Sequence, residues 1–176
     1  VAAQATAVLC DLDVRAIKIG MMFSAEIADA VAGVLERYPD IPVVLDPVMI
    51  ATSGDRLMKD DAVAAIVGKL FPRALCITPN LAEAAFLTGQ AMARDETGMA
   101  AQGQALLALG ARAALMKGGH ASTPESIDLL VTPDGTQSFS ATRIETRNTH
   151  GTGCTLSAGI AANLDLGLPL DEAVAQ

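Results

Sequence analysis

The amino-acid sequence predicts an α/β fold in which helices cover both faces of a mostly parallel sheet. Short apolar runs alternate along the chain with longer segments whose apolar residues recur at helical spacing. This alternation is typical of parallel strands joined by helical crossovers. The turn signal Pro133-Asp134-Gly135-Thr136 separates two late strand-like segments, so we expect an antiparallel hairpin at one edge of the sheet.

The first half of the chain predicts helices and strands in alternation. Ser24 precedes an apolar helical period and is a favourable N-cap, because its hydroxyl can accept a backbone N–H. The uninterrupted apolar run that ends at Asp46 predicts a strand buried on both faces. The predicted helices are 3–9, 24–38 and 60–70, and the predicted strands are 16–20, 42–46 and 75–78.

The second half continues the alternation. Gly110 follows an apolar helical period and predicts the end of that helix, since glycine readily adopts the left-handed conformation found at helix C-termini. A further helix begins within 168–173. The predicted helices are 81–88, 99–109 and 155–166, and the predicted strands are 113–117, 127–132 and 137–143.

Composition narrows the class of protein. With 176 residues, 51% of them hydrophobic, the chain can bury a full core in one domain. A net charge of -8 argues against a nucleic-acid surface, which requires a basic patch. Cys10, Cys76 and Cys154 are odd in number and far apart, which indicates neither disulfides nor zinc and favours a cytoplasmic location. No apolar run approaches the roughly 18 residues of a membrane span.

Polar residues follow several predicted strands at the point where each strand ends. Asp46, Asn80 with Glu83, and Lys117 all occupy such positions. Because ligands of parallel sheets bind beyond the carboxyl ends of the strands, we expect these side chains to face a common site. Each also has a structural interpretation: a turn at Asp46, an N-cap at Asn80, a capping box with Glu83, and a solvated strand end at Lys117.

A glycine-rich turn, Asn148-Thr149-His150-Gly151-Thr152-Gly153-Cys154, leads directly into the predicted helix 155–166. The first amides of a helix have no intrahelical partners and carry partial positive charge, so they stabilise phosphates and oxyanions. The Cys154 thiol stands where it can act as a nucleophile or base. The alternative is a tight connection with Cys154 as a small buried residue.

The order of these motifs resembles that of the ribokinase-like kinases, and within them the hydroxymethylpyrimidine and phosphomethylpyrimidine kinases of thiamine biosynthesis. The matching segments are 14–21, 43–57, 77–83, 116–120 and 150–154, so the resemblance extends over nearly the whole chain. Many sugar and nucleoside kinases of this superfamily carry aspartate at the last position of the glycine turn. Cys154 at that position resembles the pyrimidine kinases and some related pyridoxal kinases.

The resemblance implies a three-layer α/β/α sandwich. Residues 1–176 would form a single kinase domain that lacks the N-terminal strands and the C-terminal end of the family. The implied reaction is the ATP- and Mg²⁺-dependent phosphorylation of 4-amino-5-hydroxymethyl-2-methylpyrimidine, and then of its monophosphate, to the diphosphate. A cytoplasmic homodimer that acts on small molecules is implied as well.

The resemblance also assigns roles to individual residues. Cys154 is expected to be the general base, and Lys117 is expected to pair with a phosphate of ATP or substrate as the second catalytic residue. The remaining expected contacts are phosphate or ATP binding by Gly151, Thr152, Gly153, Asn80 and Asp46, Mg²⁺ binding by Glu83 and Asn80, and pyrimidine-ring contacts by Met21 and Val48.

Three other functions stay open. A pyridoxal kinase is the main alternative, because pyridoxal is also a flat heterocycle with a ring hydroxymethyl group. Pairing of Cys154 with His150 would suit a thiol hydrolase, although a hydrolase has no evident use for Lys117. A degenerate kinase fold that only senses a nucleotide or pyrimidine is the third. His120 and His150 flank glycine turns without a third ligand, so we assign neither to catalysis.

Overall fold

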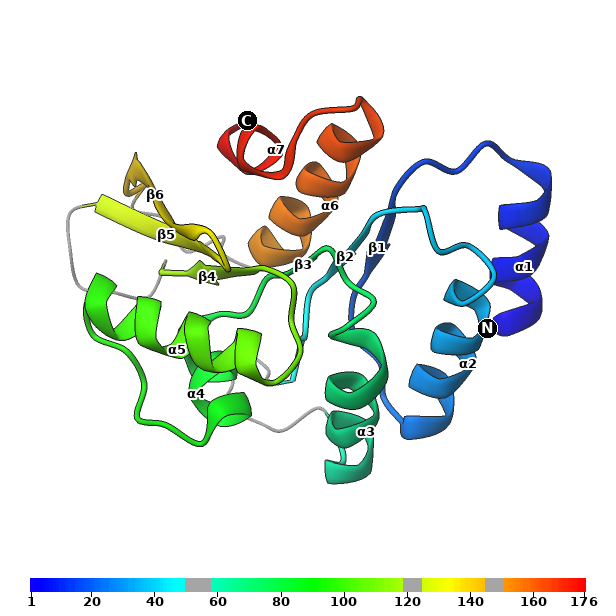
Figure 1. Cartoon of the computed structure of the whole chain (residues 1–176), viewed down its shortest axis with the longest axis horizontal. Coiled ribbons are helices and arrows are strands. Elements are labelled where there is room, and N and C mark those ends of the chain that lie inside the picture. Colours follow the sequence, from blue (N-terminus) through cyan, green and yellow to red (C-terminus); the bar gives the residue numbers. More distant parts are fainter. Residues whose placement is uncertain (50–57, 119–124, 145–150) are drawn as a thin grey trace.

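Six strands form one sheet in a computed structural model that describes residues 1–49, 58–118, 125–144 and 151–176. The sheet has the strand order β1-β2-β3-β4-β5-β6, with β1 to β4 parallel and β4 to β6 antiparallel (Figure 1). The predicted parallel sheet with an antiparallel edge is therefore confirmed. The strands are β1 (Ile17–Ile19), β2 (Val43–Leu45), β3 (Cys76–Ile77), β4 (Ala114–Lys117), β5 (Glu125–Thr132) and β6 (Gly135–Thr142).

Helices form a layer on each face of the sheet, which makes three layers in all (Figure 1). One layer contains α2 (Ala25–Leu35), α3 (Asp60–Ala65), α4 (Leu81–Thr88) and α5 (Glu96–Ala108). The opposite layer contains α6 (Thr152–Asp165) and α7 (Leu170–Ala175), while α1 (Ala2–Asp11) packs against α2. A π-helical turn, η1 (Ile66–Leu70), continues α3. Within the described ranges, no helix combines the length and apolarity needed to cross a membrane.

The strands divide their side chains between two apolar clusters, because successive residues of a strand point to opposite faces. In β2, Val43 and Leu45 pack against the α2 to α5 layer, whereas Val44 packs against α6. In β4, Met116 and Leu115 divide in the same way. The unbroken apolar runs of these strands therefore report burial on both faces, as the sequence predicted.

Local capping explains where several helices begin. The Ser24 hydroxyl accepts the Ile27 N–H at 3.4 Å, which confirms the predicted N-cap. Asp95 accepts the Gly98 N–H at 2.8 Å, so α5 begins at Glu96, three residues before the predicted start.

The helix after the glycine turn also begins earlier than its apolar pattern indicated. Gly151 has a φ of 80° and is the N-cap of α6, so the helix starts at Thr152 rather than at 155. A positive φ favours glycine, which explains why the chain can turn sharply at this point. Gly153 and Cys154 consequently lie inside the first turn of the helix, where its unpartnered amides are.

Candidate active site

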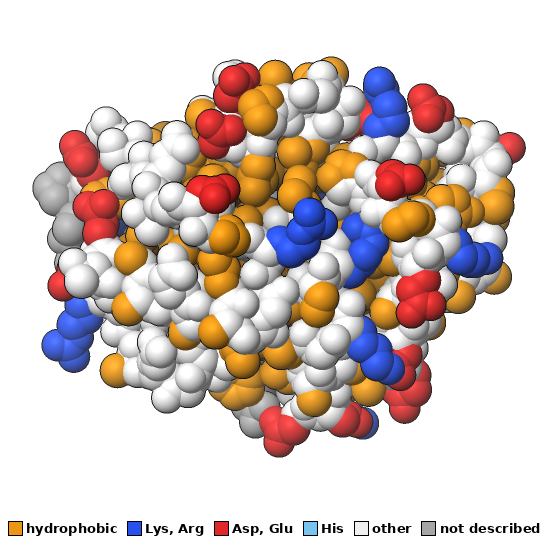
Figure 2. Space-filling model, in the orientation of Figure 1, with side chains coloured by type: hydrophobic (Ala, Val, Ile, Leu, Met, Phe, Trp, Pro, Cys, Tyr) orange, Lys and Arg blue, Asp and Glu red, His pale blue; other side chains and the backbone are white. Residues whose placement is uncertain are grey.

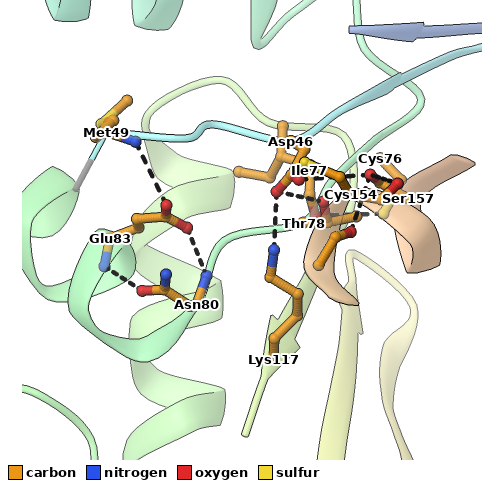
Figure 3. A network of polar contacts seen from close by, with 11 residues as sticks. Asp46, Met49, Cys76, Ile77, Thr78, Asn80, Glu83, Lys117, Cys154 and Ser157 are labelled. Carbon is orange, nitrogen blue, oxygen red and sulfur yellow. Dashed lines mark hydrogen bonds and ion pairs between the residues drawn. The ribbon is translucent and has the colours of Figure 1, made fainter. Parts of the chain in front are cut away.

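Three side chains from different elements bond to one carboxylate at the carboxyl edge of the sheet (Figure 3). Asp46 directly follows β2 and is buried, with 1% of its surface exposed. Its Oδ1 accepts hydrogen bonds from Lys117 Nζ at 2.8 Å and from the Thr78 hydroxyl at 3.2 Å. Its Oδ2 lies 3.4 Å from the Ser157 hydroxyl. Asp46 therefore connects β3, β4 and α6 at a single point.

Lys117 and Asp46 form an ion pair that is largely shielded from water. The Lys117 side chain is 15% exposed and that of Asp46 is 2% exposed. The Lys117 amide also donates to the Pro79 carbonyl at 3.0 Å, which fixes the backbone of the last residue of β4. Removing one partner of such a pair leaves a buried charge unpaired and is costly. Both the backbone and the ammonium of Lys117 are thus held in place.

The first turn of α6 lies against the Lys117 ammonium. A Cβ built on Gly153 would lie 3.0 Å from Lys117 Nζ and 4.0 Å from Asp46 Oδ2, so glycine makes room for the ammonium. The first amides of a helix point outward without intrahelical acceptors. A cation and a helix N-terminus therefore converge, which is the chemistry of a phosphate site. The Cys154 thiol belongs to the same turn, and Cys154 is exposed.

Asn80 and Glu83 form a complete capping box at the start of α4. Asn80 Oδ1 accepts the Glu83 N–H, and Glu83 Oε2 accepts the Asn80 N–H, both at 2.8 Å. The other oxygen of Glu83 accepts the Met49 N–H at 3.4 Å, which links α4 to the segment after β2. Burial raises the pKa of Glu83, while the Asn80 amide and the Lys117 charge act in the opposite direction. The structural interpretation of this pair is confirmed.

The side-chain oxygens of Glu83 and Asn80 are of the type that Mg²⁺ contacts when water and phosphate supply most of its ligands. Each Glu83 oxygen accepts one backbone N–H, and a carboxylate oxygen has a second lone pair for a water or an ion. The residues that the structure describes contain no group of three His, Cys, Asp or Glu side chains that could enclose a metal. Mg²⁺ commonly binds through one or two carboxylates while keeping several waters. The carboxylate of Glu83, a residue that is 2% exposed, is chemically compatible with such binding, and Asn80 Oδ1, which accepts the Glu83 N–H, also keeps a second lone pair.

Comparison with known proteins gives the family. The family model described as phosphomethylpyrimidine kinase matches residues 1–176. The chain belongs to this family. It is 55% identical over 174 residues to the hydroxymethylpyrimidine/phosphomethylpyrimidine kinase of Rhizobium meliloti (strain 1021), covering 99% of this chain and 65% of that protein. The chain thus spans somewhat less than two thirds of the length of that relative.

Solved structures of this family and of related kinases share the fold. The chain superimposes on phosphomethylpyrimidine kinase from Clostridium difficile 630 with a TM-score of 0.83 and 37% identity, covering 98% of this chain and 70% of that one. It superimposes on an ADP complex of Bacillus subtilis pyridoxal kinase with a TM-score of 0.88 and 30% identity, covering 98% and 64%. The predicted ribokinase-like α/β/α fold is therefore confirmed.

Two residues expected to contact the pyrimidine ring lie at the same sheet edge as the family's other motifs. Met21 follows β1 and is 58% exposed, whereas Val48 follows β2 and is half-buried. The two strands are parallel neighbours, so the residues after them lie on one edge. Their ring contacts stay predictions. His120 and His150 fall outside the described residues, as does the start of the glycine turn, 148–150.

The structure adds site residues that sequence reasoning passed over. Thr78 belongs to a noted strand end, but nothing local indicated that its hydroxyl bonds to Asp46. Ser157 is fully buried in α6. Its hydroxyl can donate one hydrogen bond, either to Asp46 or to the carbonyl oxygen of Gly153 or of Cys154; the two carbonyl oxygens each lie 3.1 Å away. The sequence signal for this residue is a serine three residues after Cys154, within a largely apolar helical segment.

Proposed function

We propose that this protein transfers the γ-phosphoryl group of ATP to the hydroxymethyl group of 4-amino-5-hydroxymethyl-2-methylpyrimidine, and then to the resulting monophosphate. The diphosphate product would serve thiamine biosynthesis. Support comes from the family of the chain and from relatives named hydroxymethylpyrimidine/phosphomethylpyrimidine kinase. The site geometry supports the same type of reaction independently of those names.

The observation that carries the proposal is the position of the Lys117 ammonium against the first turn of α6. Among the described residues, Lys117 Nζ donates a hydrogen bond to Asp46 Oδ1 at 2.8 Å. An ammonium has three donors, so two N–H groups are available for phosphate oxygens while the Asp46 bond is kept. Lys117 and the amides of α6 together would offset charge on the transferring group, the largest contribution in phosphoryl transfer.

Cys154 supplies the proposed base in the same turn of α6. As the oxygen of the substrate hydroxymethyl group bonds to the γ-phosphorus, its proton would pass to the Cys154 sulfur. The bond from that phosphorus to the bridging oxygen breaks, and the electron pair leaves with ADP. Glu83 and Asn80 would hold Mg²⁺, partly through water, and the ion would supply further positive charge to the phosphates. Gly151 and Thr152 would position the first amides of α6, which would donate hydrogen bonds to the oxygens of the transferring phosphoryl group.

Pyridoxal phosphorylation is the second candidate function. The structural likeness to Bacillus subtilis pyridoxal kinase, with a TM-score of 0.88, favours it. The same catalytic residues would serve either substrate, because both carry a hydroxymethyl group on a flat six-membered ring. The difference between them lies in ring recognition, to which we assign Met21 and Val48.

The cellular setting is also proposed. The cysteines at positions 10, 76 and 154 are free, which favours a reducing cytoplasm. On the face in Figure 2, Lys and Arg side chains are scattered among acidic ones, and a net charge of -8 disfavours nucleic-acid binding. We further propose small-molecule substrates and a homodimer, the latter from the family resemblance.

The proposed function is tested by ATP consumption in the complete protein with Mg²⁺. Hydroxymethylpyrimidine, its monophosphate and pyridoxal are supplied in parallel. We expect ATP consumption with the monophosphate. This result would distinguish the first function from the second, because a simple pyridoxal kinase does not add a second phosphate. Consumption with pyridoxal alone would replace the first function by the second. Inactivity with all three substrates would contradict both and favour a sensor or a thiol hydrolase.

A further inference from the structure

Asp128 precedes the apolar run Leu129-Leu130-Val131 in strand β5, and it lies directly opposite Lys117. Directly opposed residues of an antiparallel pair project to the same face of the sheet. The Asp128 side chain is partly buried, and its Oδ1 accepts the Gly118 N–H at 2.8 Å. Asp128 thus bonds to the residue that immediately follows the proposed phosphate-binding lysine.

Gly118 is held on two sides. A Cβ built on Gly118 would lie only 1.9 Å from the Ile127 carbonyl oxygen, so the backbone at this position touches β5. The Gly118 N–H donates a hydrogen bond to the Asp128 carboxylate. These two contacts hold the backbone of the residue that directly follows Lys117 at the end of β4.

The negative charge of Asp128 and its hydrogen bond to the Gly118 amide have separate roles. Burial raises the pKa of the Asp128 carboxyl, whereas the Gly118 amide and the Lys117 charge lower it. The Lys117 ammonium nevertheless forms its ion pair with Asp46, at 2.8 Å. The geometry therefore gives Asp128 the role of a hydrogen-bond acceptor for the backbone, with Asp46 as the counter-ion.

We propose that Asp128 is a positioning residue, which aligns Lys117 for phosphate binding by accepting the Gly118 N–H. This inference rests on the proposed function, since it assigns the phosphate contact to Lys117. The position of the acceptor oxygen is what matters, and the negative charge is secondary. An asparagine can place an oxygen at the same point without charge, whereas a glutamate keeps the charge and moves the oxygen by one methylene.

The test compares Asp128→Asn with Asp128→Glu in the complete protein. Affinity for a non-hydrolysable ATP analogue is measured by calorimetry, and amide exchange at Gly118 is measured by NMR without nucleotide. Asp128→Asn should bind the analogue within about threefold of the unaltered protein, and Asp128→Glu should bind it roughly tenfold more weakly, as expected for a misplaced charge-assisted contact. Slow exchange at Gly118 should persist in the asparagine variant and be lost in the glutamate variant.

Asp134→Asn is the matched control, because it makes the same charge change at an exposed position of the hairpin turn. It should alter neither measurement. The proposal is wrong if the order of the two Asp128 variants is reversed, if both bind like the unaltered protein, or if both are equally weak. Absence of binding of the ATP analogue by the unaltered protein would contradict the kinase function, and the exchange measurement would still decide whether Asp128 holds Gly118.

Discussion

Gly153→Ala should separate phosphate binding from folding. The added Cβ would lie 3.0 Å from Lys117 Nζ, tighter than most Cβ contacts, so the ammonium has to shift by a few tenths of an ångström. The atom that moves is the end of a flexible side chain, and the fold can tolerate that shift. In a helix, alanine is more favourable than glycine by about 1 kcal/mol. We therefore expect the free energy of unfolding to stay unchanged or to rise.

The expected loss is in binding of the nucleotide. The shifted Lys117 ammonium keeps its bond to Asp46 but is misplaced for phosphate, and a charge-assisted bond of that kind contributes about 1.5–3 kcal/mol. That range corresponds to a decrease of roughly 10- to 100-fold in kcat/KM for ATP. The assay is ADP release over a range of ATP concentrations, combined with thermal unfolding of the same samples.

Gly159→Ala is the control in the same helix. A Cβ at Gly159 has no neighbour within 4 Å, so this change carries the helix-propensity gain without the contact to Lys117. It should leave ATP kinetics unchanged. Normal kcat/KM for ATP in Gly153→Ala would refute the argument that Lys117 and the first turn of α6 form one phosphate site. A large loss of thermal stability would refute the expected direction of the folding effect.

Four further predictions concern other parts of the structure. Cys154→Ala should lower kcat by about 10²-fold or more with unchanged ADP affinity, measured by kinetics and calorimetry. Asp46→Asn should lower the free energy of unfolding in urea by about 3 kcal/mol, because the Lys117 charge loses its partner. Gly103→Ala should cost about 1–3 kcal/mol in the same assay, since its Cβ would lie 2.5 Å from a β5 valine. Burial raises the pKa of Cys76 to about 12, so a thiol reagent at pH 8 should label the native protein at the two exposed cysteines only.

Much of the fold follows from patterns that local sequence contains. Apolar runs such as the one before Asp46 predicted strands buried on both faces, and the structure places them in the parallel part of the sheet. Helix boundaries were less accurate where capping chemistry overrode the apolar period. Asp95 extends α5 toward its N-terminus, and Gly151 starts α6 at Thr152. A hydroxyl, carboxylate or positive φ at one residue decides such a boundary, and apolar periodicity does not contain that information.

The candidate site was predictable in part for the same reason. The position of Lys117 at the end of a strand and the glycine turn before Cys154 are local features, and both were predicted to lie in the site. The capping box of Asn80 and Glu83 is also a local pattern. The magnesium role that we propose for them does not follow from that pattern, because the same two side chains satisfy the backbone of α4.

By itself, the sequence determined the order of helices and strands, the family, and which residues stand at strand ends. Only the tertiary structure decided that Thr78, Lys117 and Ser157 converge on Asp46, and that Gly153 makes room for the ammonium. Ser157 and Asp46 are 111 residues apart in the chain. Contacts at that separation depend on strand register and helix packing, which arise from the collective burial of the core and leave no local periodic signal.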